Sequence, residues 1–194
     1  MHISTLNHVV KLSPLRLSLS RHHIAVIAIF RNEAHVLREW IEHYLAFGVD
    51  HFYLIDNNSN DDYRTVLAPY IERGLIDLFF TARDGFQIGA YTELLPVLKE
   101  EAEWIGVFDL DEFIYPPHDC CFAEVLEGFA QHEVILAPWL SFGSSGFVAQ
   151  PGSVTESFTW RGLAQVSRAF LKAFSRTRSV QLLSQHNPEI RLLR

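Results

Sequence analysis

The sequence of 194 residues has little of what marks several large classes of protein. It contains only two cysteines, Cys120 and Cys121, and adjacent cysteines rarely form a disulfide without strain. We therefore expect no disulfide framework and, with it, a reducing cytoplasmic setting. No apolar run approaches the ~20 residues of a membrane-spanning helix, so we expect no transmembrane segment.

Basic side chains are outnumbered as well. The 16 Lys and Arg residues face 23 Asp and Glu residues, and the formal net charge of −7 argues against a protein that binds nucleic acid by coating its phosphates. The balance is uneven, because residues 1–150 carry −12 and residues 151–194 carry +5. Two interpretations stay open: the basic segment packs against the acidic body, or Lys172, Arg176 or Arg178 meets an anionic ligand.

Several catalytic motifs are missing. The first long apolar run, Ile24–Phe30, is followed by Arg31-Asn32-Glu33 and not by a glycine-rich phosphate loop. This absence argues against dinucleotide-dependent dehydrogenases and P-loop kinases. The chain also has no Gly-x-Ser-x-Gly nucleophile elbow and no paired Cys or His spacing typical of zinc.

Apolar side chains, in contrast, are plentiful: 48% of the residues are hydrophobic and 13% are aromatic. This content can bury the core of one domain, which is also the number that the length favours. We expect residues 23–194 to form that single domain. Residues 1–22 show no clear period and are expected to form a loosely attached arm or an edge element.

Apolar strands and amphipathic helices alternate in the first part of this domain. Predicted strands at residues 24–30, 51–55, 75–80 and 104–108 are separated by three stretches with apolar residues at helical spacing. Such alternation favours right-handed crossovers and a parallel sheet with helices on its faces.

The alternation is lost after Pro117. A short helix at residues 122–129, a strand at 134–140, a Gly/Ser turn at 143–146 and an alternating stretch at 154–160 follow. These elements favour a mixed sheet on the same core. The predicted fold class is therefore α/β, with a mostly parallel, Rossmann-like sheet flanked by helices and a mixed-sheet C-terminal half.

Polar residues follow the carboxyl ends of all four predicted strands. These ends meet at one edge of a parallel sheet, where ligands bind in such folds. One acidic loop is ordinary turn chemistry, but four polar loops at one edge predict a site. The loops are Arg31-Asn32-Glu33, Asp56-Asn57-Asn58, Arg83-Asp84 and Asp109-Leu110-Asp111-Glu112.

The last of these loops suggests a metal. Asp109 and Asp111 directly follow an apolar strand, and a spacing of two in an extended chain puts both carboxylates on one side. Neighbouring carboxylates repel each other unless a cation lies between them, and oxygen ligands suit Mg²⁺ or Mn²⁺. A helix cap or a solvated turn is the alternative, because this short pattern is common by chance.

Taken in order, the motifs resemble the glycosyltransferase family 2-like and family 92 enzymes. The resemblance runs from about Ile24 to His186. It implies the GT-A fold, with residues 23–117 as a nucleotide-binding half and residues 118–194 as an acceptor-side half. It also implies transfer of a sugar from a nucleoside-diphosphate donor to a saccharide or other hydroxyl acceptor. The matching segments are Phe30–Glu33, Leu37–Trp40, Gly48–Phe52, Asp56–Asp61, Asp109–Phe113 and Trp139–Gly146.

The resemblance implies roles for single residues around the donor. Arg31, Asn32 and Glu33 lie at the nucleotide end of the first strand. Asp56, accompanied by Asn58, takes the position that hydrogen-bonds the base or ribose in such enzymes. Donor-flanking positions at a polar helix start fall to Gln87 and Tyr91.

It also implies a metal and an acceptor side. Asp109 and Asp111 match the Asp-x-Asp motif that holds Mn²⁺ or Mg²⁺ and through it the donor diphosphate, which makes Asp111 a catalytic residue too. His186 resembles a late histidine that completes the metal shell. Trp139 and the Gly/Ser turn resemble the acceptor side. For an inverting reaction, Glu156 on the alternating stretch is the candidate general base.

Two segments depart from the family pattern. Leu171–Phe174 replaces a Lys-Ser-Ile-type segment, and His186-Asn187-Pro188 stands where a His-His pair is common. The chain ends at Arg194, which leaves open that an acceptor-binding or lid segment, and activity with it, is missing. Two alternatives also stay open: a nucleotidyltransferase or sugar-nucleotide-binding enzyme of similar architecture, and a non-catalytic relative.

Overall fold

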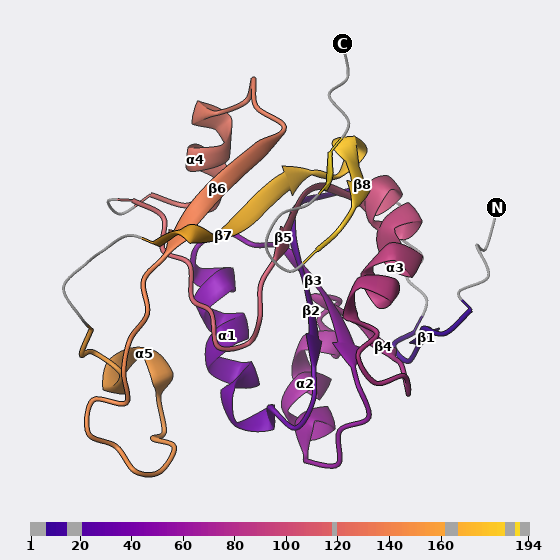
Figure 1. Ribbon diagram of the computed structural model, residues 1–194. Helices are drawn as coiled ribbons and strands as arrows, with labels where there is room; N and C mark the ends of the chain where they lie inside the picture. The colour runs from indigo at the N-terminus through magenta and orange to yellow at the C-terminus, as the bar shows by residue number, and fades with distance from the viewer. Residues whose placement is uncertain (1–6, 15–20, 118–119, 162–166, 185–188, 191–194) are drawn as a thin grey trace.

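The computed structural model describes residues 7–14, 21–117, 120–161, 167–184 and 189–190 (Figure 1). These residues form a seven-stranded sheet with the order β1-β4-β3-β2-β5-β7-β6, and a two-stranded sheet of β8 and β9. The strands are β1 Val10–Lys11, β2 His22–Phe30, β3 His51–Asp56, β4 Ile76–Phe80, β5 Ala102–Val107, β6 Val134–Trp139, β7 Ser167–Arg176, β8 Val180–Leu182 and β9 Glu189–Ile190.

Helices connect the parallel strands. The helices are α1 Ala34–Ala46, α2 Tyr63–Glu72, α3 Gln87–Glu101, α4 Phe122–Gly128 and α5 Val154–Ser157, with a 3₁₀ turn η1 at Thr177–Ser179. Strands β2, β3, β4 and β5 run parallel, whereas β1, β6 and β7 pair antiparallel with their neighbours. The sheet confirms the predicted fold class, including its mixed C-terminal half.

Strand β2 lies at the centre because both of its faces are apolar. Successive side chains of a strand point to opposite faces, so the uninterrupted apolar run of β2 contributes side chains to two hydrophobic cores. Val26 and Ala28 pack with the residues of α1 and α2, whereas Ala25 and Ile27 pack with those of α3. Figure 1 shows α1 and α2 on one side of the sheet and α3 on the other.

This arrangement creates a switch point beside β2. Strand β3 lies on one side of β2 and β5 on the other, and the helices that leave β2 and β4 cover opposite faces. In an open parallel sheet the loops at the carboxyl ends of such strands diverge and leave a crevice. The polar loops predicted from the sequence therefore meet where β2, β3 and β5 end.

Part of the N-terminal segment lies at the sheet edge. Strand β1 pairs antiparallel with β4, with Val10 opposite Phe80. Lys11 forms an ion pair of 3.0 Å with the buried Asp77, and the Ser13 hydroxyl donates a hydrogen bond of 3.2 Å to the same carboxylate. These contacts fasten the described residues 7–14 to the outer strand of the parallel sheet.

The stretch at residues 154–160 is not the predicted extended segment. Residues Val154–Ser157 form the helix α5, which begins after Ser153. The Ser153 side chain accepts a hydrogen bond from the Glu156 backbone N–H, which is the contact of an N-cap. The cap decides the conformation, because a short alternating stretch such as residues 154–160 does not by itself distinguish a strand from one helical turn.

The basic C-terminal segment packs against the acidic body. Arg176 lies 2.6 Å from Glu103 and Arg178 lies 2.8 Å from Glu133, and the third cation, Lys172, lies beside two further carboxylates. Among the two interpretations of the charge imbalance, these contacts support complementary packing. An anionic ligand is not needed to explain the three cations.

Candidate active site

The acidic loop after β5 gathers three carboxylates. One oxygen from each of Asp109, Asp111 and Glu112 lies within 4.8 Å of the others. Helix α1 supports this loop from below: the Trp40 indole N–H donates to the Asp109 carbonyl oxygen over 3.0 Å, and the Tyr44 hydroxyl donates to the Glu112 carbonyl oxygen over 3.0 Å. The large buried side chains of α1 therefore fix the position of the acidic loop and also fill the core.

A buried lysine lies against the same loop. The Lys172 ammonium, on β7, donates to Asp109 Oδ2 over 3.0 Å and lies 2.8 Å from Glu112 Oε2. Its side chain is only 1% exposed. The Glu112 carboxylate also accepts a hydrogen bond of 2.9 Å from the Asp109 backbone N–H, so the loop is closed on itself.

The electrostatics of the loop favour an added cation. Burial raises the pKa of Glu112 to about 7, although the Lys172 hydrogen bond acts in the opposite direction. Burial also raises the pKa of Glu33, and the charges of Asp111 and Asp109 add to that rise. Three carboxylates and one ammonium leave two negative charges when all are ionised.

The donor set fits Mg²⁺ or Mn²⁺. These ions prefer carboxylate oxygens, and the excess charge of the cluster equals that of a divalent cation. Glu112 Oε1 is buried and has no hydrogen-bond partner among the residues that the structure describes, so one oxygen of the cluster is unsatisfied by protein donors. Asp109, Asp111 and Glu112 are therefore able to hold such an ion. His186, the fourth predicted ligand, lies outside the described residues.

Gln87 and Tyr91 connect the acidic loop to β2. Gln87 Nε2 lies 3.4 Å from Asp109 Oδ1 and donates to the Tyr91 hydroxyl over 3.1 Å. The Tyr91 hydroxyl also accepts a hydrogen bond of 3.2 Å from the Ile29 backbone N–H. Tyr91 is fully buried and contacts Gln87; the donor-flanking role of Tyr91 stays a prediction.

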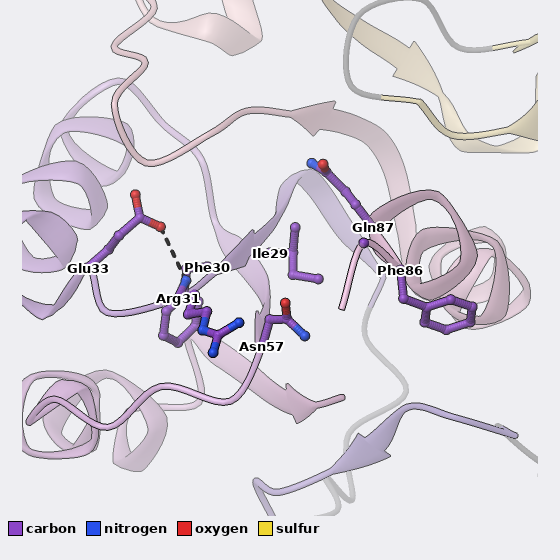
Figure 2. A pocket seen from close by; sticks show the side chains of 8 residues that line it. Ile29, Phe30, Arg31, Glu33, Asn57, Phe86 and Gln87 are labelled. Carbon is purple, nitrogen blue, oxygen red and sulfur yellow. Dashed lines mark hydrogen bonds between the residues drawn. The ribbon is translucent and has the colours of Figure 1, made fainter. Parts of the chain in front are cut away.

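A pocket of about 270 Å³ opens next to Gln87. Figure 2 shows Arg31 and Glu33 on one side of it, Phe86 and Gln87 on the other, and Asn57 between them. Three of the predicted donor-site residues, Arg31, Glu33 and Gln87, thus line one cavity. Its lining is Ile29, Phe30, Arg31, Glu33, Asn57, Gly85, Phe86 and Gln87.

Asn32 ties together the loops that follow β2 and β3. Its backbone N–H donates to the Ser59 hydroxyl over 2.9 Å, and its side-chain oxygen accepts from the Asn60 N–H over 2.8 Å. Asn32 has a positive φ of 58°, a conformation that asparagine tolerates better than most residues. The Asp61 carboxylate adds a third link by accepting from the Ala34 N–H over 2.8 Å at the start of α1. Asn32 is therefore a brace beneath the site and is absent from the pocket lining.

Asp56 and Asn58 occupy the turn after β3. Asp56 is 2% exposed, and Asn58 is exposed with a φ of 64°. Neither residue lines the pocket. A role of these two residues in binding the nucleoside stays a prediction.

The predicted acceptor side is only partly assembled around the acidic loop. The Trp139 ring, on β6, lies 5.7 Å from the Lys172 ammonium and so borders the acidic loop. Glu156 is exposed on α5, which is fastened to α1 through Glu39. The base role of Glu156 stays a prediction.

Sequence reasoning missed Asn57 and Phe86 as pocket residues. Asn57 donates from Nδ2 to the carbonyl oxygens of Thr81 and Arg83 over 3.0 and 2.9 Å, which holds the loop after β4 against the pocket. Asn57 belongs to a polar cluster in which the resemblance pointed to its neighbours Asp56 and Asn58. Phe86 stands just before α3, and the Arg83 guanidinium covers its ring at 4.9 Å; no local signal marks it.

The model of glycosyltransferase family 92 matches residues 23–190. The chain belongs to this family. A family 92 protein of Oryza sativa subsp. japonica is 30% identical over 145 residues, which cover 72% of this chain and 25% of that protein. A family 92 protein of Arabidopsis thaliana is 32% identical over 103 residues, 50% of this chain and 17% of that protein. The chain thus spans about a quarter or less of these two family members.

Among solved structures, this family 92 chain resembles the crystal structure of S. aureus TarS residues 1–349. The TM-score is 0.47 at 16% identity, over 80% of this chain and 47% of that one. In the part of the chain that the structure describes, helices fall short of the length and apolar character needed to cross a membrane. The cytoplasmic setting inferred from the cysteines stays a prediction.

Proposed function

We propose that this family 92 chain binds a nucleoside-diphosphate sugar together with Mg²⁺ or Mn²⁺ and transfers the sugar to a hydroxyl acceptor. The observation that carries the proposal is the position of Gln87. This residue lines the pocket and lies 3.4 Å from Asp109, so the pocket and the acidic loop are two parts of one site. Membership of family 92 supports glycosyl transfer as the reaction.

The chemistry of the two parts suits the two ends of such a donor. The pocket presents the Phe86 and Ile29 side chains and the Asn57 amide, a mixture that suits a nucleoside. Beside it, Asp109, Asp111 and Glu112 supply oxygen ligands for a cation. When bound, that cation supplies Lewis-acid stabilisation of the charge on the departing diphosphate.

The chain's own residues orient this arrangement. Tyr91 and the Ile29 backbone fix Gln87, and Lys172 and α1 fix the acidic loop. Preorganised groups of this kind favour catalysis because they need not reorganise as charge develops. The acceptor hydroxyl must lose a proton, and Glu156 is the proposed base for an inverting reaction.

A titration with metal and nucleotide tests the proposal. Calorimetry with several nucleoside diphosphates, with and without Mn²⁺, should show binding that depends on the metal. Asp111→Asn should abolish that metal dependence and the turnover of donor, with the melting temperature little changed. Asp62→Asn, the same change at an exposed aspartate, is the matched control. Unchanged activity in Asp111→Asn contradicts the assignment, and binding without donor hydrolysis or transfer in the parent identifies a non-catalytic relative.

A further inference from the structure

Lys172 is the most deeply buried cation in the described part of the chain. Its side chain is 1% exposed, whereas lysine is almost never fully buried unless it is paired. Removing a charge from water costs on the order of several kcal/mol. Only opposite charges close to the buried group offset this cost. Here Asp109 and Glu112 supply those charges at 3.0 and 2.8 Å.

The neighbouring cation of β7 has a different environment. Arg176 pairs with Glu103, whose side chain is 41% exposed, and its guanidinium covers the Trp104 ring at 4.3 Å. Lys172 instead pairs with two of the three carboxylates of the acidic loop and lies 5.7 Å from the Trp139 ring. Arg176 thus pairs with a carboxylate of the neighbouring strand, whereas Lys172 contacts the site.

We propose that Lys172 is a positioning residue, whose ammonium holds the Asp109 carboxylate in the orientation that binds a divalent cation. The inference rests on the function proposed above. Lys172, on β7, donates to Asp109 Oδ2, and Gln87, at the start of α3, donates to Oδ1 of the same carboxylate. With donors on both oxygens, the Asp109 carboxylate cannot rotate freely, and Asp109 is presented to the metal in one orientation.

The two possible roles of Lys172, orienting Asp109 or acting through its charge alone, predict opposite effects on the affinity for the metal. An ammonium close to a cation site repels the cation, so if Lys172 acted through its charge alone, its removal would tighten metal binding. If Lys172 orients Asp109, its removal weakens metal binding in spite of the more favourable charge. The sign of the change therefore separates the two roles.

The comparison is made between Glu112→Gln and the double variant Lys172→Met with Glu112→Gln. Glutamine at position 112 removes the second negative charge beside the lysine from both variants, so the two variants differ only in the side chain at position 172. Affinity for Mn²⁺ alone is measured by calorimetry on the full chain, and thermal unfolding is followed in parallel. Arg176→Met with Glu103→Gln is the matched control, because it replaces a second ion pair that involves a β7 residue in the same way.

The double variant at positions 172 and 112 should bind Mn²⁺ at least fivefold more weakly than Glu112→Gln, with the control unchanged from the parent. Equal or tighter binding in that double variant overturns the proposal while leaving the proposed function intact. A parent chain that binds no Mn²⁺, even with a nucleoside diphosphate present, overturns both. If the methionine variant does not fold, Lys172→Gln with Glu112→Gln replaces it, with the same expected direction.

Discussion

The Tyr63 hydroxyl donates a hydrogen bond of 2.7 Å to Asp56 Oδ2, and the Ser59 backbone N–H donates one of 2.7 Å to Oδ1. Burial, followed by the contact with Asp56, raises the pKa of Tyr63 to about 12, so its hydroxyl stays a donor at neutral pH. Both oxygens of a buried carboxylate thus have protein partners. The Asp56 motif, which suggested a nucleoside contact, also closes the turn after β3 in the manner of an Asx turn.

Asp56→Ala separates these two roles. If Asp56 also binds base or ribose, the variant should weaken donor binding by about 1.5–3 kcal/mol, the usual range for a hydrogen bond to a charged group. Tyr63→Phe is the control, because it disturbs the turn and keeps the carboxylate. Calorimetry should then show weak donor binding in Asp56→Ala only. Donor affinity equal to that of the parent assigns Asp56 to the turn alone.

Glu39 fastens the acceptor-side segment to α1. Its carboxylate accepts hydrogen bonds from the backbone N–H groups of Val154 and Thr155 at 2.7 and 2.9 Å, and from the hydroxyls of Ser153 and Thr155. Glu39→Ala should expose the Val154 and Thr155 amides, with hydrogen exchange at least tenfold faster. Glu72→Ala, at an exposed site of α2, should leave both rates unchanged. Slow exchange in Glu39→Ala would show that α5 is held by other contacts.

The same contact predicts a response to acid. Burial alone would raise the pKa of Glu39, but the hydrogen bonds from Val154 and Thr155 outweigh it, and the pKa is lowered from 4.5. A carboxylate with a depressed folded pKa stabilises the fold above its unfolded value and loses that effect as the pH falls through the folded value. The fastening of α5 should therefore hold at neutral pH, begin to weaken only below pH 4.5, and be lost as the pH falls through the lowered pKa of Glu39.

The contribution of Glu112 to stability should depend on pH in the opposite direction. Its pKa is raised from 4.5 to about 7, chiefly by burial, so the folded state binds a proton that the unfolded state has lost. The stabilisation is complete below pH 4.5 and declines as the pH rises to about 7. Urea unfolding without divalent cations should show this decline in the parent, and Glu112→Gln should flatten it. An identical slope in both proteins would rule out Glu112 as its source.

Glu156→Gln tests the proposed base. General-base assistance contributes about 10²–10⁴-fold, so turnover should fall at least a hundredfold while Mn²⁺ and donor binding stay unchanged. Glu127→Gln, at an exposed position of α4, controls for the loss of a surface carboxylate on a short helix. A loss of less than tenfold, or a product that retains the anomeric configuration, removes Glu156 from the mechanism.

The parallel half of the sheet was predictable because its signals are local. The apolar run of β2 and the helical spacing of α1 are each long enough to specify one conformation, and the fold confirms both. The meeting of the loops after β2, β3 and β5 follows from the parallel order alone. Asp109 and Asp111 also lie together, but in a turn and not in the extended chain from which their proximity was predicted.

The remaining features depend on contacts between distant segments. Helix α5 is capped by Ser153 and held by Glu39, and the separation of more than a hundred residues from Glu39 leaves no trace in the local pattern. The partners of Lys172 depend on the register of β7 against β5, in which Phe174 lies opposite Gly106. A shift of one residue would turn Lys172 to the other face of the sheet.

The docking of strand β7 determines when the acidic loop is completed during folding. Lys172 is 63 residues from Asp109 along the chain, and contacts between distant segments form slowly because a long loop must first close. A chain folded only through β5 holds Asp109 and Glu112 without their buried counter-ion. The loop gains that counter-ion only after β7 has docked. The metal binding proposed for this loop should therefore reach its full strength only once β7 has joined the sheet.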